Sequence, residues 1–147
     1  MRVVLDTNLI VRAAGGRGGL GHQLFLLAIS EPHRLLLSHS LYAEIRKVMH
    51  YPHLRALHGL DDLEIQSFLD HLVMHSEQVN VSSVTVGPLV GLDPTDDAIL
   101  LAAVAGSADA IGTKNRHFFA PDVLQFAHLH GIRILDDAEL IVELRSH

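Results

Sequence analysis

The stretch RVVLDTN, residues 2–8, begins with a short, mostly apolar run that stops at an aspartate. Its first part, residues 2–5, predicts a buried strand of a parallel sheet, because such strands carry nearly continuous apolar side chains. Further strands are predicted at residues 35–38, 110–113 and 132–135, with a weaker one at 78–81. Asp6 therefore lies at the carboxyl end of a predicted strand, as do Ser38 and Thr113.

Helical patterns separate these runs, at residues 22–31, 40–50, 62–75, 94–106, 122–130 and 137–145. Short apolar strands that alternate with helices predict an α/β fold with a mainly parallel central sheet. The 147 residues contain no repeat and no linker, so we expect one domain over residues 1–147. Binding sites of such sheets form beyond the carboxyl ends of the strands.

The composition narrows the possible functions. The chain has no cysteine, which excludes disulfides, thiolate metal ligands and a cysteine nucleophile, and suits the reducing cytoplasm. It has no signal-peptide pattern and no apolar run of about 18 residues, so a cytoplasmic protein without a membrane partner is expected. The net charge of −6 argues against a broad basic surface for nucleic acid, while surplus acids suit divalent cations.

The segment GRGGLG, residues 16–21, matches the spacing of a dinucleotide-binding loop. In that motif the glycines follow directly on a strand, so that a helix N-terminus meets the pyrophosphate. About ten residues intervene here, and we interpret the segment as a loop between two helical pieces.

Glu44, in SLYAEIRKVM, shares a helix face with Leu41, Ile45 and Val48. A glutamate on an apolar face points inward, where burial is costly unless the carboxylate is paired, protonated or bound to a cation. The alternative is a glutamate at the edge of the apolar stripe that reaches water through its flexible stem.

The stretch DPTDD, residues 93–97, begins a helix. Asp93 fits the N-cap, Pro94 the first helical position and Asp96 the third, where a carboxylate interacts favourably with the helix dipole. Asp97 is in line with the apolar residues three, four and seven positions later. We therefore expect Asp97 to point into the fold.

Asp6, Glu44 and Asp97 together form a predicted inward-facing set of carboxylates that repel one another unless a cation lies among them. Oxygen ligands without cysteine favour Mg²⁺ or Mn²⁺ over Zn²⁺. Such ions activate water and stabilise a leaving oxygen, which points to hydrolysis of phosphodiesters. The alternative for Asp6 is a structural cap of the next helix.

Three motifs in order resemble the PIN domain family, over about residues 2–145. They are VVLDTNLIV (3–11), LLLSHSLYAEIRKVMHYPHL (35–54) and DPTDDAILLAAVAGSADAIGTKNRHF (93–118). The resemblance is to the VapC-type subgroup, often described as the toxin component of toxin–antitoxin pairs. It implies a three-layer αβα fold that cuts RNA at an acidic Mg²⁺ or Mn²⁺ site, commonly as a homodimer held in check by an antitoxin.

The resemblance places the first acid of the family on Asp6, its helix glutamate on Glu44 and its third acid on Asp97, with the neighbouring Asp96 as a further metal ligand. Asn115 and His117 stand where many relatives carry an aspartate. A site with three acids is expected to hold a second metal ion more weakly, although Asn115 can still offer a neutral oxygen or a hydrogen bond.

Other polar residues are assigned supporting roles. Asn8 and Thr113 orient ligands or water, or alternatively cap a helix and end a strand. Arg46, Lys114 and Arg116 flank the acids and are candidates for binding RNA phosphates, with a solvated surface as the alternative. The twelve histidines show no zinc-binding spacing and are expected at the surface or in structural hydrogen bonds.

The sequence therefore favours a metal-dependent endoribonuclease. The first alternative is a non-catalytic PIN-like module that binds RNA or protein, suggested by the missing fourth acid. A phosphatase that forms an aspartyl-phosphate on Asp6 is less well supported, because Asn8 occupies the position of the expected general acid.

Overall fold

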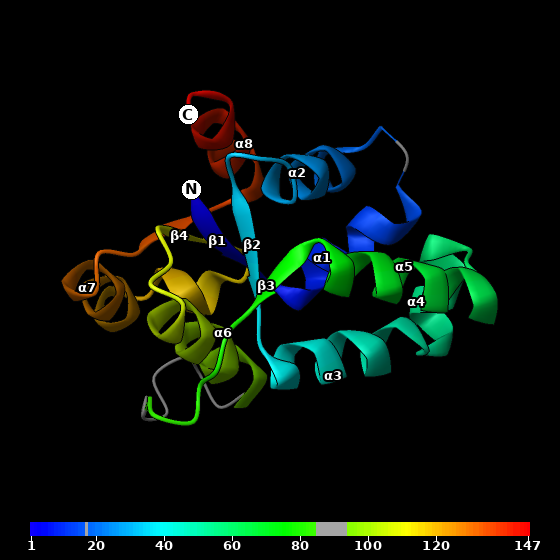
Figure 1. Ribbon diagram of the computed structural model, residues 1–147, viewed down its shortest axis with the longest axis horizontal. Helices are drawn as coiled ribbons and strands as arrows, with labels where there is room; N and C mark the ends of the chain where they lie inside the picture. Colours follow the sequence, from blue (N-terminus) through cyan, green and yellow to red (C-terminus); the bar gives the residue numbers. More distant parts are fainter. Residues whose placement is uncertain (17, 85–93) are drawn as a thin grey trace.

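The computed structural model describes residues 1–16, 18–84 and 94–147 and contains a five-stranded sheet (Figure 1). All strand pairs are parallel, in the order β3-β2-β1-β4-β5. The strands are β1 (Arg2–Leu5), β2 (Arg34–Leu37), β3 (Ser76–Gln78), β4 (Ala110–Gly112) and β5 (Arg133–Leu135). The predicted α/β class with a parallel sheet is confirmed.

Helices cover both faces of the sheet. They are α1 (Thr7–Gly15), α2 (Leu20–Ala28), α3 (His39–Met49), α4 (Pro52–His58), α5 (Asp62–Met74), α6 (Pro94–Ala105), α7 (Pro121–Leu129) and α8 (Asp137–Arg145), with the 3-10 helix η1 at Arg116–Phe119. In Figure 1, α6 and α7 lie on one side of the strands and α1 and α2 on the other, where α8 packs against α2. This is a three-layer αβα arrangement. Within the described residues, no helix has the length and apolar character needed to cross a membrane.

The strand order places a topological switch point between β1 and β4, the place where parallel sheets of this kind have their crevice. From β1 the chain extends the sheet in one direction through β2 and β3, and then returns to the other side of β1 to add β4 and β5. Ligands of such sheets bind at this switch point, outside the carboxyl ends of the strands. The Asp6 N–H donates to the Gly112 carbonyl at 2.9 Å, so the ends of β1 and β4 lie side by side.

A glycine closes β4 next to this crevice. A Cβ atom on Gly112 would lie 2.7 Å from Cδ2 of Leu140 and 2.8 Å from Cδ2 of Leu5, closer than real Cβ contacts. The missing side chain lets α8 and β1 pack tightly against the end of β4. Thr113, the next residue, is thereby held fully buried at the strand end.

Most elements agree with the sequence prediction, although α1 had been expected only as a helix after Asp6 without a range, and η1 had not been predicted. The weak strand expected at 78–81 occurs at Ser76–Gln78, and the helix expected at 22–31 is α2. The helix α4 was not predicted. In the glycine-rich segment, Gly16 ends α1 and Gly19 precedes α2, so it connects two helices as expected.

An ion pair ties the amino ends of the strands together, at the edge opposite the crevice. Arg2 donates two hydrogen bonds to Glu77, at 3.1 and 2.5 Å, and a third to the Gly106 carbonyl at 2.9 Å. The hydrogen bonds from Arg2 are the main reason why the pKa of Glu77 is lowered; desolvation opposes this effect, and the charges of Arg2 and Arg34 add to it.

Replacing Glu77 by Gln is expected to lower the free energy of unfolding at pH 7 by less than about 1 kcal/mol, since the side chain is 39% exposed and solvent screens the pair. Because the pKa of Glu77 is lowered in the folded state, its carboxylate stabilises the fold at pH values above the ordinary glutamate pKa of about 4.3. This stabilisation is lost as the pH falls through the lowered pKa. Urea unfolding of both proteins between pH 7 and 3 should therefore show the difference closing below about pH 4.5. A difference that grows on acidification would contradict the assignment.

Candidate functional site

Asp6 lies at the carboxyl end of β1 with only 6% of its surface exposed. One carboxylate oxygen accepts the Asn8 N–H at 3.4 Å, and the other accepts the Thr113 hydroxyl at 2.7 Å. The structural interpretation of Asp6 as the cap of α1 is confirmed, and its position at the end of β1 leaves the metal-binding role as a prediction. The Thr113 hydroxyl holds the Asp6 carboxylate in one orientation.

A second carboxylate is linked to Asp6 through two intervening residues, Thr113 and Asn115. The Asn115 N–H donates to the Thr113 hydroxyl at 3.0 Å, and the Asn115 side-chain amide donates to Asp96 at 3.1 Å. Asp96 is buried, with 8% of its surface exposed. Asp6, Thr113, Asn115 and Asp96 form a continuous set of hydrogen bonds, referred to below as the Asp6–Asp96 network.

The expectation that Asp97 is the inward acid is wrong as regards burial. Asp96 is buried and Asp97 is half-buried. Asp96 lies in line with the residues three, four and seven positions later, Ile99, Leu100 and Ala103, and all three are buried. Because α6 is apolar on nearly every side, the sequence contained two possible inward stripes, and packing against the sheet selected the one that ends at Asp96. The predicted N-cap, Asp93, lies outside the described residues.

The orientation of Asn115 is fixed by a backbone donor. Its side-chain oxygen accepts the His117 N–H at 3.0 Å and caps η1. The amide nitrogen must therefore face Asp96, where it donates. The Asn115 side-chain oxygen already accepts one N–H and keeps a second lone pair, so its expected contact with a ligand stays a prediction. Its hydrogen-bond donation, the other expected role, goes to a carboxylate.

Glu44 is half-buried on α3, whereas its stripe neighbours Leu41, Ile45 and Val48 are buried. It has neither a hydrogen bond nor an ion pair with any described residue. Residues 1–16, 18–84 and 94–147 contain no group of three or more His, Cys, Asp or Glu side chains placed to hold a metal ion. The structure thus brings Asp6 and Asp96 into one network and does not assemble Asp6, Glu44 and Asp97 as a three-carboxylate cluster.

The donor set of the Asp6–Asp96 network fits a hard divalent cation. Mg²⁺ binds proteins through one or two carboxylates, with water and substrate phosphates as the remaining ligands. Two buried carboxylates at a switch point meet this requirement. Thr7, the residue after Asp6, adds a buried hydroxyl. Its Oγ1 has no hydrogen-bond partner among the described residues. Sequence reasoning had not singled out Thr7.

The three predicted phosphate-binding residues differ in their surroundings. Lys114 lies beside the network and its ammonium is 3.7 Å from the buried Asp137, which restrains it. Arg116 is exposed in η1. Arg46 is exposed on α3 and lines a groove of about 390 Å³ together with His39, Tyr42, Lys47 and His50. These aromatic and basic residues recur at helical spacing, so the sequence alone could have placed them on one face of α3.

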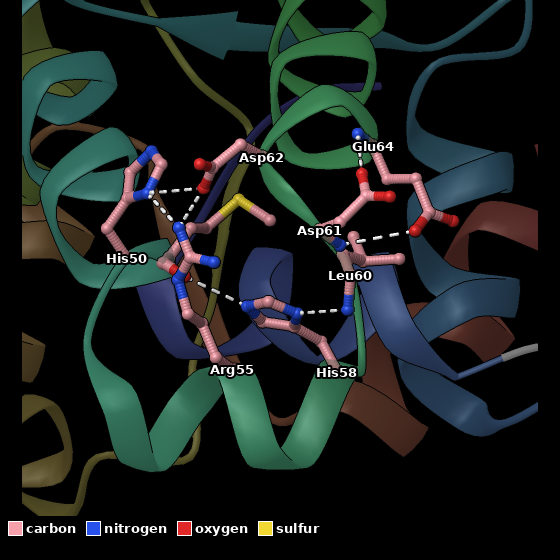
Figure 2. Close-up of polar contacts among 8 residues, drawn as sticks. His50, Arg55, His58, Leu60, Asp61, Asp62 and Glu64 are labelled. Carbon is pink, nitrogen blue, oxygen red and sulfur yellow. Dashed lines mark hydrogen bonds and ion pairs between the residues drawn. The ribbon is translucent and has the colours of Figure 1, made fainter.

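The buried histidines have structural roles, as expected. His33 hydrogen-bonds through Nε2 to the Leu144 carbonyl at 2.8 Å. His58 lies between two backbone groups, with Nε2 at 2.9 Å from the Met49 carbonyl and Nδ1 accepting the Leu60 N–H at 3.0 Å (Figure 2). Both rings link separate segments of the chain.

Fold and site together define an α/β protein with buried carboxylates at the switch point of a parallel sheet. A family model described as the PIN domain matches residues 2–117, and the chain belongs to this family. PIN domains are generally nucleases and typically use divalent metal ions. The match ends at His117, earlier than the expected residue 145. Comparisons with curated proteins and with solved structures gave no match.

Proposed function

We propose that this protein is an endoribonuclease that hydrolyses RNA phosphodiester bonds with Mg²⁺ or Mn²⁺. The observation that supports this most strongly is the Asp6–Asp96 network, which places two buried carboxylates at the crevice of a PIN domain. A divalent ion bound there supplies charge neutralisation at the phosphate and an activated water. Asp6 and Asp96 would hold the ion, with Glu44 and Asp97 as further predicted ligands.

The other residues of the network have positioning roles in this proposal. Thr113 and Asn115 keep the two carboxylates in fixed orientations, so that binding an ion requires little rearrangement. Lys114, restrained by Asp137, and the exposed Arg46 and Arg116 would bind phosphates of the RNA. Asn8, in the first turn of α1, would contact substrate or water.

Incubation of RNA with Mg²⁺ or Mn²⁺ is expected to give cleavage products that disappear on addition of EDTA. Asp6→Asn should abolish cleavage, because it removes a charge from the ion site; its single side-chain oxygen can keep the cap of α1, while the amide nitrogen then faces the Thr113 hydroxyl. Gel analysis of labelled RNA provides the readout, and circular dichroism checks that the variant is folded. Cleavage that survives both EDTA and Asp6→Asn would refute the proposal.

We further propose the biological setting that the VapC-type motifs suggest: a cytoplasmic toxin that forms a homodimer and is inhibited by an antitoxin protein. The absence of cysteine is compatible with this compartment. The toxin role predicts that expression arrests growth, that Asp6→Asn relieves the arrest, and that an adjacent short gene encodes a DNA-binding partner. Growth unaffected by the wild-type protein would argue against it.

One observation favours a second candidate, a non-catalytic module that binds RNA or protein. The amide of Asn115 donates to Asp96 where many relatives have an acid, so Asp96 is partly satisfied without a cation. Titration calorimetry with Mn²⁺ discriminates between the candidates. Binding at micromolar to millimolar concentration favours the nuclease, and no binding favours the module.

A further inference from the structure

A pocket of about 510 Å³ lies between α1 and α4, next to the proposed active site. Residues of α1 from Asn8 onward line one wall, and residues of α4 from Leu54 to His58 line the other. The volume falls within the range of about 300–1,000 Å³ that is typical of small-ligand sites. The pocket is therefore large enough to hold a nucleotide.

The α1 wall begins at the proposed metal site. Asn8 lies two residues after Asp6, and Val11, Arg12 and Gly15 follow it at the spacing of one helix face. A ligand in the pocket would thus be continuous with a phosphate bound at Asp6.

Two helices approach closely at the far end of the pocket. A Cβ atom on Gly15 would lie only 2.4 Å from the Cα atom of His58, so the absence of a side chain brings the backbones of α1 and α4 together. His58 is held by Met49 and Leu60, as Figure 2 shows, and forms part of the wall. This end of the pocket is built from fixed backbone.

Arg12 provides a cation without a partner in the part of the chain that the structure describes. It is exposed, and its guanidinium makes no hydrogen bond or ion pair with residues 1–16, 18–84 or 94–147. By contrast, Arg55 on α4 points away toward Asp62 and His50 and is bonded to both (Figure 2). A free guanidinium in a chain of net charge −6 is suited to bind an anion, and phosphate matches its geometry.

The opposite wall is apolar. Leu57 is 78% exposed, and Leu54 is half-buried beside it. An apolar wall facing a free guanidinium complements a nucleotide, which has a base and sugar to pack and a phosphate to pair. We propose that this pocket binds one nucleotide of the RNA strand next to the scissile phosphate, with Arg12 on its phosphate and Leu54 and Leu57 against its base or ribose.

This inference rests on the proposed function, but binding can be measured without cleavage. Fluorescence anisotropy of a fluorescein-labelled single-stranded RNA of eight nucleotides, in EDTA, gives the dissociation constant. Arg12→Gln is expected to raise it about tenfold and to reduce the slope of log affinity against log salt by about 0.7, the contribution of one phosphate contact. Leu57→Glu should weaken binding at least as much, because its carboxylate would face the phosphate.

Matched controls change the same residue types elsewhere. Arg34→Gln removes an exposed arginine at the amino end of β2, and Leu63→Glu alters a leucine of α5 that is 82% exposed and does not line the pocket. Both should bind RNA like the wild type. Unchanged RNA binding by Arg12→Gln and Leu57→Glu, or equal losses in the controls, would overturn the inference and leave the pocket to a protein partner.

Cleavage assays with Mn²⁺ separate this inference from the proposed function. Pocket-dependent RNA binding without any metal-dependent cleavage would support the pocket and refute the nuclease. Metal-dependent cleavage, combined with RNA binding by both pocket variants as tight as that of the wild type, would support the nuclease and refute the pocket. If both hold, Arg12→Gln should raise KM about tenfold with a smaller change in kcat, since the contact is present before the reaction.

Discussion

Replacing Asp96 by Asn is expected to reduce metal-dependent RNA cleavage by roughly 10³-fold, the equivalent of several kcal/mol of transition-state stabilisation. The same replacement at Asp97 is expected to cause a much smaller loss. Asp96 is buried and belongs to the Asp6–Asp96 network, whereas Asp97 is half-buried one position further along α6. This prediction rests on the proposed function. The two variants together decide whether Asp96 or Asp97 is the metal-binding acid of α6.

The two variants control for each other. Each removes one negative charge from the first turn of α6, so the effects on the helix dipole and on net charge are similar. An asparagine at position 96 still offers an oxygen to the Asn115 amide, which favours retention of the fold. Initial rates at saturating Mn²⁺, together with thermal melts, provide the measurement. A larger loss from Asp97→Asn would show that the acid one position further on binds the metal.

Asn115→Asp is expected to destabilise the protein in EDTA by about 1–3 kcal/mol and to make its stability depend strongly on divalent metal. The new carboxylate can still accept the His117 N–H and cap η1. Toward Asp96 it replaces a donated hydrogen bond by repulsion between like charges. A cation between the two carboxylates removes this repulsion, so Mn²⁺ should bind more tightly than in the wild type.

Thermal melts with and without Mn²⁺ measure this effect. An ion at ten times its dissociation constant adds about 1.4 kcal/mol to stability, so the variant should gain more from a given concentration than the wild type. Asn115→Ala is the control, because it removes the amide and the cap without adding charge. Equal metal-induced shifts in the aspartate and alanine variants would contradict the proposed orientation of Asn115.

The sheet and its polar edge were predictable because their signals are local. The four predicted apolar runs and the weaker run each correspond to a strand. A short run of nearly continuous apolar residues is typical of a parallel strand that is buried on both faces. Asp6 and Thr113 were expected at carboxyl ends, and they lie hydrogen-bonded although 107 positions separate them. Parallel pairing alone brings such strand ends to one edge.

The helix α4 was missed for a physical reason as well. It spans Pro52–His58, two turns, which is too short for a periodic apolar face to stand out. Its boundary signals were present, with Pro52 at the start and the left-handed Gly59 at the end. The pocket beside α1 depends on this helix and was therefore not predictable either.

The sequence by itself determined the class of fold, the edge at which the site forms and the kind of side chain found there. Only the tertiary structure decided which neighbouring acid is buried, because α6 is apolar almost all round and its rotation is set by packing on the sheet. It also decided how Asn115 faces Asp96, since that depends on the backbone N–H of His117. The positions of the strands follow from local patterns, whereas the strand order and the choice between adjacent side chains depend on contacts between elements far apart in the chain.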